Sequence, residues 1–392
     1  MIVRRRNLGI GVVGFGWMGK AHSRSYRRIP ALYPERTVEP LLVICADAVE
    51  ARRAEAVGGF GFAETTDDWR KVVEHPDVDA VVVTAPNMLH VEIVTAAAAA
   101  GKAVFCEKPV GGTPAQTVAA EHAARHVVSG VGYNYRWAPL VQHARSVIGN
   151  GGIGQITNYR GRFLSCYGND PLGVLSWRFL SDEAGHGVST DLLSHAIDLA
   201  MHLVAPITEV VGFGETFIAQ RPLPQPGAAT HYDHGSTDDP TGNVTNEDWF
   251  GAMVRFENGA VGTFEASRSM TGPESQHAFE VYGTTGSMSW NLERMNELQL
   301  YLAGDDPESG YRTVFGGDRF PDHGAFVPGR ANGIGFEDLV TIEDHHFATA
   351  VAEDRPFDPG LDAAVRYVSV QDALLRSWES RRWERVCDLR ID

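Results

Sequence analysis

The first third of the chain alternates apolar runs with segments of helical period. Runs rich in Val and Ile predict strands at residues 8–14, 39–47, 78–86, 102–106 and 126–135. Between the strands, apolar residues recur at helical spacing, which predicts helices at 18–29, 48–57, 90–101 and 113–126. Continuous apolar strands separated by helices are typical of a parallel sheet covered on both faces. We therefore expect a doubly wound α/β domain here.

The pattern changes after about residue 135. Longer strand candidates appear at 154–165, 248–269 and 278–290, and the sequences "ENGA" and "GTTGS" are typical of hairpin turns. Helices are expected at 185–204, near 340–353 and at 361–380. This half predicts an α+β domain with a mostly antiparallel sheet, and we place the boundary between domains 1–134 and 135–392.

Two segments lack any clear period. Residues 219–245 and 303–336 are rich in Pro, Gly and Asp, and we expect surface loops there. The functional interpretation of these loops is a lid over a site.

Composition narrows the class of protein. A chain of 392 residues favours two domains, and a net charge of 34 minus 50, or −16, argues against nucleic acid or an anionic membrane surface as a partner. No stretch approaches the roughly 20 apolar residues of a membrane span. The run "LGIGVV" is too short for a signal peptide. The four cysteines lie far apart, which favours reduced thiols in a cytoplasmic protein.

A glycine-rich turn follows the first strand. Gly14, Gly16 and Gly19 form the pattern G-x-G-x-x-G between a strand and a helix, the context in which it binds dinucleotides. The helix N-terminus there offers free N–H groups to a pyrophosphate. The alternative is a turn that is merely rich in glycine. We expect cofactor contacts from the whole turn: Gly14, Phe15, Gly16, Trp17, Met18 and Gly19.

Asp47 ends the second strand. A carboxylate there can accept hydrogen bonds from the adenosine ribose hydroxyls and would repel a 2′-phosphate, so it favours NAD over NADP. The spacing from Gly19 is 28 residues, which the segment "IPALYPERTVEP" explains as an inserted loop. The alternative role is a cap on the following helix. Arg52 and Arg53 lie a turn further along.

Polar residues also follow the third and fourth strands, at the sheet edge where ligands bind in such folds. The third strand ends in "TAPNMLH", and the fourth runs into "CEKP". Asn87 could instead cap the next helix, and Lys108 could be a surface lysine paired with Glu107. The cofactor contacts predicted at this edge are Thr84, Pro86, Asn87, His90, Glu107 and Lys108.

A second group of candidates lies in the helix predicted at 185–204. Asp191 and His195 are four residues apart and would share a face, so the carboxylate could orient the imidazole. Alone, His195 is equally consistent with a buried core histidine. Asp198 and His202 continue the stripe, but His195 and His202 would lie about 10 Å apart along the helix. We therefore predict no metal site.

Together these residues resemble the Gfo/Idh/MocA oxidoreductase family, which includes glucose–fructose oxidoreductase and inositol dehydrogenases. The matching pieces are "GFGWMGKAH", "TAPNMLH", "CEKP", "GYNYRWAP", "SWR" and "DLLSHAID", in the family's order. The resemblance implies an N-terminal Rossmann domain and a C-terminal domain with a large open antiparallel sheet. That sheet often forms the oligomer interface in the family, so a homodimer or homotetramer is expected.

The resemblance also assigns roles to residues of this chain. Lys108 matches the lysine of the family's Glu-Lys-Pro motif, and Asp191 and His195 match its helical Asp and His. Further residues fall in segments that approach the cofactor or the substrate, although Trp177 and Arg178 could also be a core aromatic residue and a surface arginine. These residues are Tyr133, Asn134, Arg136, Trp177 and Arg178.

We expect an NAD-dependent dehydrogenase that oxidises a secondary hydroxyl of a sugar, sugar derivative or cyclitol. His195, oriented by Asp191, would take the hydroxyl proton, and Lys108 would donate a hydrogen bond to the same oxygen. The expected substrate-binding residues are Lys108, Tyr133, Asp191 and His195. Two alternatives remain: a redox-neutral lyase or glycosidase with tightly bound NAD, and a non-catalytic dinucleotide sensor.

Overall fold

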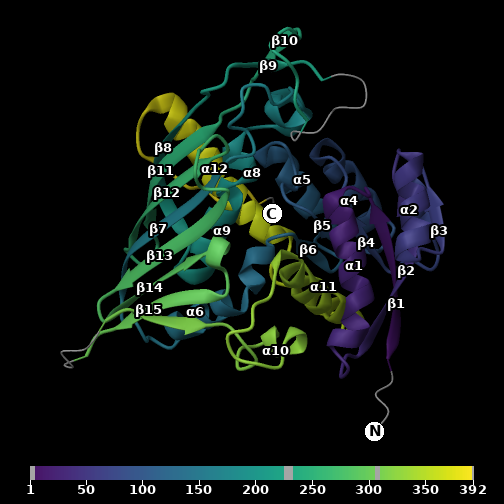
Figure 1. Cartoon of the computed structure of the whole chain (residues 1–392), viewed down its shortest axis with the longest axis horizontal. Helices are drawn as coiled ribbons and strands as arrows, with labels where there is room; N and C mark the ends of the chain where they lie inside the picture. The colour runs from purple at the N-terminus through teal and green to yellow at the C-terminus, as the bar shows by residue number, and fades with distance from the viewer. Residues whose placement is uncertain (1–4, 225–232, 305–309, 391–392) are drawn as a thin grey trace.

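The computed structural model describes residues 5–224, 233–304 and 310–390, and it contains two large sheets (Figure 1). The first is a six-stranded sheet in the order β3-β2-β1-β4-β5-β6, and every pairing is parallel. This confirms the predicted Rossmann fold. Its strands are β1 (Arg6–Val13), β2 (Val38–Ala46), β3 (Glu64–Thr66), β4 (Ala80–Val83), β5 (Ala103–Cys106) and β6 (Ser129–Val131). Its helices are α1 (Trp17–Leu32), α2 (Glu50–Phe60), α3 (Arg70–Glu74), α4 (His90–Ala99) and α5 (Pro114–Ala124).

The strand predicted at 126–135 is much shorter in the structure. β6 ends at Val131, which pairs with Cys106, the last residue of β5. With no partner strand beyond that point, the chain turns into the 3₁₀ helix η2 (Asn134–Trp137). The segment "GYNYRW" therefore lies at the sheet edge rather than within the sheet.

The second sheet has nine strands in the order β16-β15-β14-β13-β7-β12-β11-β8-β17. All of its pairings are antiparallel except that between β7 and β12, which confirms the large, mostly antiparallel sheet. The strands are β7 (Ile156–Ser165), β8 (Ile207–Glu215), β11 (Trp249–Phe256), β12 (Val261–Ser267), β13 (Ser275–Gly283), β14 (Gly286–Asn291), β15 (Glu297–Leu302), β16 (Arg312–Phe315) and β17 (Glu384–Arg385).

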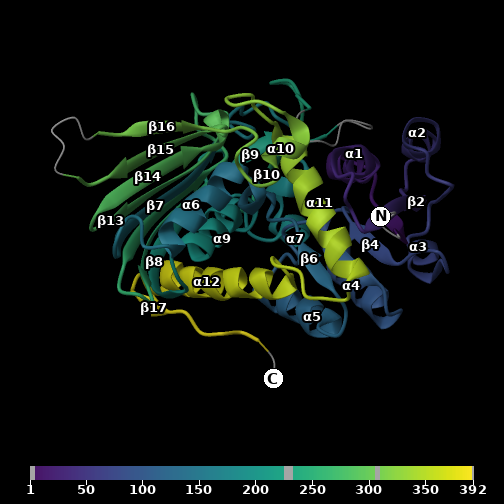
Figure 2. The ribbon, with the colours of Figure 1, turned by 90° about the horizontal axis from the view of Figure 1, so that it is seen from below.

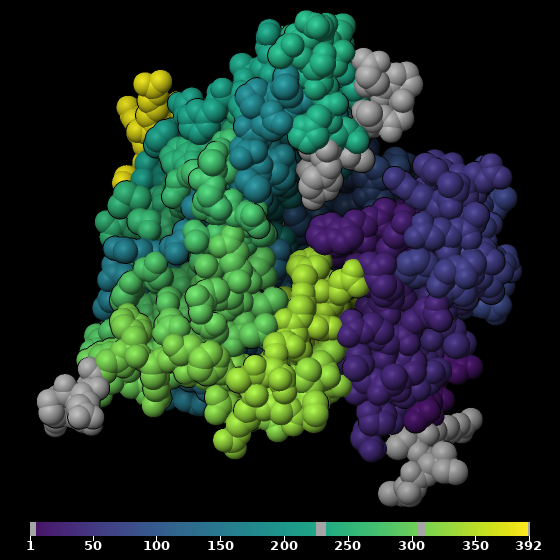
Figure 3. Space-filling model, viewed as in Figure 1, coloured from purple at the N-terminus to yellow at the C-terminus, as the bar shows by residue number. Residues whose placement is uncertain are grey.

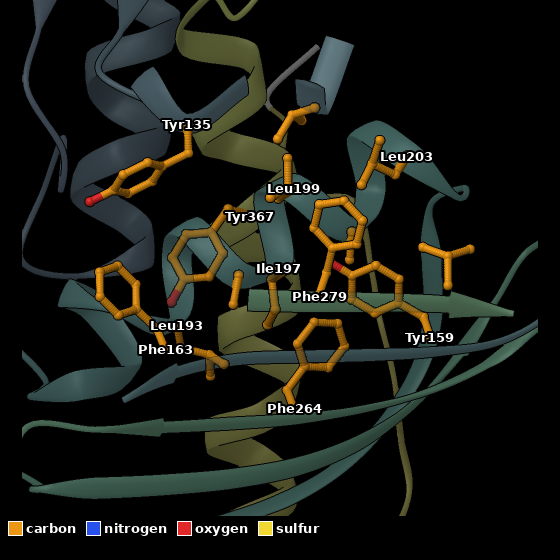
Figure 4. Packing of buried hydrophobic residues seen from close by; sticks show 14 of the residues in the cluster. Tyr135, Tyr159, Phe163, Leu193, Ile197, Leu199, Leu203, Phe264, Phe279 and Tyr367 are labelled. Carbon is orange, nitrogen blue, oxygen red and sulfur yellow. The ribbon is translucent and has the colours of Figure 1, made fainter. Parts of the chain in front are cut away.

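Helices cover only one face of this sheet. α6 (Pro139–Gly149), α9 (Leu193–Leu203) and α12 (Leu361–Ser380) lie against it, and no described element covers the opposite face (Figure 2). Aromatic side chains of the strands, including Tyr159 and Phe279, pack against Ile197 of α9 in one buried cluster (Figure 4). The alternation of buried and more exposed residues along β11 follows from this one-sided cover.

The helix predicted at 185–204 is broken into two. α8 (Val188–Asp191) and α9 are separated by Leu192. The carboxylate of Glu247 accepts hydrogen bonds from the backbone N–H groups of Gly187 and Ser189, both at 2.9 Å, so the helix begins only at Val188. The break puts Asp191 at the end of one helix, so the exact one-turn spacing to His195 is lost.

The two segments expected as surface loops contain some regular structure. The first holds two short strands, β9 (Gln220–Pro222) and β10 (Thr241–Asn243), which pair antiparallel. The second contains β16 and the short helix α10 (His323–Phe326). The pairing of β9 with β10 joins residues that are distant in the chain, such as Pro222 and Thr241, so no period in the sequence reveals it. Residues 225–232 and 305–309 of these segments lie outside the described residues.

Helix α11 (Phe336–Ala352) joins the two halves. It follows the second sheet in the chain but packs on α1 of the first half. Figure 3 shows it, in yellow-green, between the purple amino-terminal residues and the green strands of the second sheet. Its Phe347 is fully buried against Phe105 of β5, at a ring-centroid distance of 5.2 Å. Within the described parts of the chain, no helix is long and apolar enough to cross a bilayer.

Candidate active site

The glycine-rich turn has the predicted form. Gly14 has a φ of 93°, and a Cβ added at Gly19 would lie 2.0 Å from the carbonyl oxygen of Gly14. The fold itself therefore requires glycine at these two positions. At Gly16, the N-cap of α1, an added Cβ would meet no atom within 4 Å. The space at Gly16 is open, as close approach of a pyrophosphate to the backbone needs.

Asp47 holds the glycine-rich turn from β2. Its Oδ2 accepts a hydrogen bond from the Phe15 backbone N–H at 2.7 Å, and its Oδ1 accepts one from Val49 N–H at 2.8 Å. The second bond shapes the entry to α2, although Val49, not Asp47, is the cap residue. Arg53 donates to the Asp47 carbonyl oxygen at 2.7 Å and Arg52 lies 3.5 Å from its carboxylate. Contact between Asp47 and a ribose stays a prediction.

The residues after β4 are tied to three different segments. Thr84 Oγ1 donates to the carbonyl oxygen of Gly14 at 2.5 Å. The Asn87 amide donates to the Ala184 carbonyl oxygen at 3.0 Å, so Asn87 bridges the two halves. Both ring nitrogens of His90 face backbone carbonyl oxygens, those of Pro109 at 2.8 Å and Ala85 at 2.7 Å. The hydrogen bonds of Thr84, Asn87 and His90 therefore fix the turn that contains Pro86, and Pro86 itself is exposed.

The two halves of the molecule meet in an ion pair between Lys108 and Asp191. Lys108 Nζ lies 2.6 Å from Asp191 Oδ1 and 3.2 Å from the Asp191 carbonyl oxygen. The predicted alternative, an exposed pair of Lys108 with Glu107, is wrong: the Lys108 side chain is only 18% exposed, and the Glu107 carboxylate contacts His22 instead. The Asp191 carbonyl oxygen, at the end of α8, also accepts a hydrogen bond from Ser194 Oγ at 2.9 Å.

Asp191 collects most of the polar contacts of this region. Tyr167 donates to its Oδ2 at 2.9 Å, and Arg178 lies 3.6 Å from the same oxygen. Burial alone would raise the pKa of Asp191, but the charges of Lys108 and Arg178 and the hydrogen bonds from Lys108 and Tyr167 outweigh it and hold the pKa well below its usual value. Asp191 is therefore ionised.

His195 lies beside this pair in a cage of aromatic rings. Its ring is 4.7 Å from that of Tyr135, 5.9 Å from Tyr133 and 6.0 Å from Phe163, centroid to centroid. Burial, followed by the charge of Lys108, holds the pKa of His195 well below its ordinary value, so the imidazole is neutral. A neutral imidazole can accept a proton.

The predicted orientation of His195 by Asp191 needs correction. Among the described residues, no hydrogen bond joins the two side chains, because the Asp191 oxygens face Lys108 and Tyr167. The aromatic cage orients the imidazole instead. Asp191 positions Lys108, and it influences His195 only through charge.

A partly open pocket is lined by Asp191. The predicted residues Asn87, Trp177 and Arg178 line it, and the Arg178 guanidinium stacks on the Trp177 ring at 4.7 Å. Sequence reasoning missed four further lining residues that have polar side chains. Two of them, His186 and Thr190, fall within the helix predicted at 185–204, whereas the other two come from loops of the second half. The four residues are Tyr167, His186, Thr190 and Arg268.

Arg136 has a different role from the predicted cofactor contact. Its guanidinium is buried, donates to both Asp198 oxygens at 2.8 and 2.5 Å, and donates to Asp358 Oδ1 at 3.0 Å. With these donors committed to carboxylates, the Arg136 side chain fixes η2 to helix α9. Asn134, also buried, has an amide nitrogen without a described partner. Contact of Asn134 and Tyr133 with ligands stays a prediction.

Comparison with known proteins gives consistent results. Residues 8–133 match the model of the oxidoreductase family with an NAD-binding Rossmann fold, and residues 141–289 match a GFO/IDH/MocA C-terminal domain. The chain is 37% identical to levoglucosan dehydrogenase of Pseudarthrobacter phenanthrenivorans over 384 residues, 97% of this chain and 98% of that protein. The chain belongs to the GFO/IDH/MocA oxidoreductase family.

Solved structures of this family resemble the whole chain. Levoglucosan dehydrogenase in complex with NADH superposes with a TM-score of 0.92 at 37% identity, covering 98% of this chain and 100% of that one. The complex with NADH and levoglucosan has a TM-score of 0.91. The scyllo-inositol 2-dehydrogenase (NAD(+)) of Bacillus subtilis is 27% identical over 74% of this chain and 76% of that protein. This member of the GFO/IDH/MocA family is an NAD-dependent sugar or cyclitol dehydrogenase.

The open space at Gly16 gives a test of cofactor binding that separates fold from function. In Gly16→Ala the added methyl group meets no protein atom, so the melting temperature should match that of the unaltered protein. NADH binding should weaken at least about 10-fold, or roughly 1.4 kcal/mol, since the methyl group obstructs approach of the pyrophosphate. Isothermal titration calorimetry and thermal denaturation measure the two effects.

Gly19→Ala is the matched comparison. Its methyl group collides with the Gly14 carbonyl oxygen, so this variant should lose stability as well as NADH affinity. Equal NADH affinity in Gly16→Ala and the unaltered protein would contradict the placement of the pyrophosphate.

Proposed function

We propose that the pocket lined by Asp191 binds an anhydro sugar of the levoglucosan type and that a secondary hydroxyl of this sugar is oxidised there. Asp191 lines the pocket, its carboxylate pairs with Lys108, and the neutral His195 lies near both groups; this arrangement carries the proposal. The 37% identity to levoglucosan dehydrogenase over nearly the full length of both chains supports the substrate class. An anhydro sugar is a sugar derivative, within the wider class of sugars, sugar derivatives and cyclitols.

Lys108 is prepared to bind the reacting oxygen. An ammonium group has three N–H donors, and two of them are directed at Asp191 Oδ1 and the Asp191 carbonyl oxygen. The third remains for the substrate oxygen, where it would stabilise the negative charge that develops as the proton leaves. Asp191, itself held by Tyr167 and Arg178, keeps the ammonium group in one place.

His195 would accept the hydroxyl proton. The aromatic rings of Tyr133, Tyr135 and Phe163 exclude water around its imidazole, and burial keeps it neutral until the proton arrives. When bound, NAD supplies the acceptor for the hydride. In our proposal the glycine-rich turn and Asp47 would hold it, and Thr84 would support the turn.

The segment around β9 would cover the substrate from the side of the second half. Arg221 of β9 is fully buried and donates to the Asp170 carbonyl oxygen at 2.8 Å and to that of Gly168 at 2.5 Å, directly after Tyr167 of the pocket. Because β9 is tied to the pocket wall in this way, residues 219–224 and 233–245 serve in our proposal as a lid on the sugar. We also propose a cytoplasmic location, which the four free cysteines support.

The substrate proposal is tested by NADH formation in the presence of a panel of polyols. Levoglucosan should give a higher kcat/KM than myo-inositol, scyllo-inositol or glucose, because the relative with 37% identity is a levoglucosan dehydrogenase. A higher kcat/KM for an inositol would move the substrate class to cyclitols. Consumption of a sugar without net NADH would instead favour the redox-neutral chemistry.

Lys108→Met tests the assigned donor. Removing one hydrogen bond to a developing oxyanion typically costs about 100-fold to 1,000-fold in kcat, and NADH affinity should remain nearly unchanged. His195→Ala should also lower kcat, and the double variant should lose far less than the product of the single losses. Steady-state kinetics and NADH titration measure both. Lys71→Met, at an exposed lysine of α3, is the control and should behave like the unaltered protein.

We further propose a homodimer or homotetramer assembled through the uncovered face of the nine-stranded sheet. Apolar side chains stand on adjacent strands of that face, where Phe213 of β8 is 52% exposed, Met253 of β11 is 54% exposed and Val261 of β12 is 41% exposed. A contiguous exposed apolar patch is typical of a protein interface.

Met253→Glu should therefore weaken assembly, because it places a charge in the centre of the patch. Light scattering at micromolar concentration should show an oligomer for the unaltered protein and a shift toward monomer for the variant. Val57→Glu, at an exposed position of α2 in the first half, serves as the control. A monomeric unaltered protein would argue against this interface.

A further inference from the structure

A buried polar cluster includes Glu107 of the "CEKP" segment, and none of its three residues lines the pocket. His22 of α1 stands between two carboxylates that come from opposite directions. Its Nδ1 is 2.9 and 3.0 Å from the two Asp344 oxygens of α11, and its Nε2 is 3.1 Å from Glu107 Oε1. The three side chains join α1, the end of β5 and α11. Nothing in the proposed reaction uses His22 or Asp344.

The cluster is closed to solvent. His22 and Asp344 are fully buried, and Glu107 is 8% exposed. Each His22 nitrogen faces a carboxylate, and a carboxylate can only accept, so both nitrogens must carry a proton. Burial alone would lower the pKa of His22, but Asp344 and Glu107 outweigh it and hold the pKa well above its ordinary value. His22 is therefore an imidazolium.

The other groups near His22 do not compete for its protons. The neighbouring Glu343 is fully buried, and neither of its carboxylate oxygens has a described partner. Burial raises the pKa of Glu343 well above its ordinary value, so it is a neutral acid. The Tyr26 hydroxyl is also buried near Asp344, and burial raises its pKa. On the remaining side the ring of Phe105 lies 5.1 Å from the imidazole.

Glu107 links this cluster to the active site. Its Oε2 accepts a hydrogen bond from the Lys108 backbone N–H at 3.2 Å, while Oε1 faces His22. Behind the carboxylate lies Gly132, where an added Cβ would come within 2.7 Å of Glu107 Oε1. The carboxylate is thus fixed on three sides, and the backbone of Lys108 is fixed with it.

Stability alone does not explain such an arrangement. Burying two carboxylates and an imidazolium costs desolvation free energy, and well-packed apolar residues in the same place are often neutral or stabilising. A buried ionic cluster is expected where it defines one geometry that an apolar contact would leave loose. Here that geometry is the position of the residue next to Lys108.

We propose that His22 is a positioning residue for the dehydrogenase reaction: held by Asp344, it fixes the Glu107 carboxylate and so places Lys108 for its contacts with Asp191 and the substrate oxygen. The proposal rests on the proposed role of Lys108. His22 itself touches neither substrate nor cofactor in this assignment. Its influence on the reaction passes through Lys108 alone.

The test combines His22→Gln with Lys108→Met. His22→Gln should lower kcat by about 10-fold to 100-fold, since a displacement near 1 Å in a reacting group costs about 100-fold. The NADH dissociation constant should change less than about 2-fold, because the glycine-rich turn is untouched. In the Lys108→Met background the same substitution should leave kcat unchanged, because the side chain that it positions is already gone.

Two further variants separate positioning from stability. His345→Gln changes a histidine next to Asp344 on the same helix, where it stacks on Tyr33 at 3.7 Å, and should leave kcat unaltered. Asp344→Asn retains the shape of the cluster but removes one of the two charges that favour the imidazolium. The imidazolium is present below its pKa, and the substitution lowers that pKa, so kcat in this variant should decline at a lower pH than in the unaltered protein.

The outcomes are distinguishable. Normal kcat in Lys108→Met contradicts the proposed function, and this proposal with it. A large loss in Lys108→Met with unaltered kcat in His22→Gln contradicts only the positioning role. A loss in His22→Gln that multiplies with that of Lys108→Met also contradicts it, since His22 would then act by another route. If His22→Gln does not fold, an unchanged kcat and pH profile in folded Asp344→Asn overturns the proposal.

Discussion

The contact between Lys108 and Asp191 is the constraint around which the molecule is organised. It joins the end of a strand in the first half to the end of a short helix in the second half, and both side chains are largely shielded from water. A charge pair in such a place needs further partners, because desolvation otherwise outweighs the attraction. Tyr167 and Arg178 supply them on the Asp191 side. The same shielding makes the ammonium group effective toward a reacting oxygen, since water does not compete for it.

The second half of the molecule fixes the other partner of the reaction. His195 lies on α9, and three residues later Asp198 forms the buried ion pair with Arg136 of η2. That pair holds α9 against the segment carrying Tyr133 and Tyr135, the rings that surround His195. The imidazole is therefore oriented by packing, whereas the ammonium group is oriented by charge. The two groups have separate supports although they meet at one site.

The parts of this architecture that were predictable are those with local signals. Continuous Val and Ile runs are enough to predict the strands of the parallel sheet. Among these strands only β3 was not predicted, because its sequence, "ETT", is short and polar. The site lysine, aspartate and histidine followed from motif resemblance. The hydrogen bonds of Asp191 could not be predicted in this way. The prediction assumed one continuous helix through Asp191 and His195, whereas the helix is interrupted at Leu192. His22 ends the motif "GFGWMGKAH", but its role could not be predicted, since its partners lie 85 and 322 residues away in the chain.

The placement of α11 has a consequence for how the chain acquires its structure during synthesis. All six strands of the parallel sheet lie before residue 134, but Phe347 and its neighbours on α11 cover part of the apolar surface of that half. A nascent chain whose first 134 residues have just emerged from the ribosome would still expose that surface. Domains usually fold as units from the N-terminus, and exposed apolar surface promotes aggregation. Because α11 follows more than 200 residues later, that apolar surface stays uncovered until nearly the whole chain has been made.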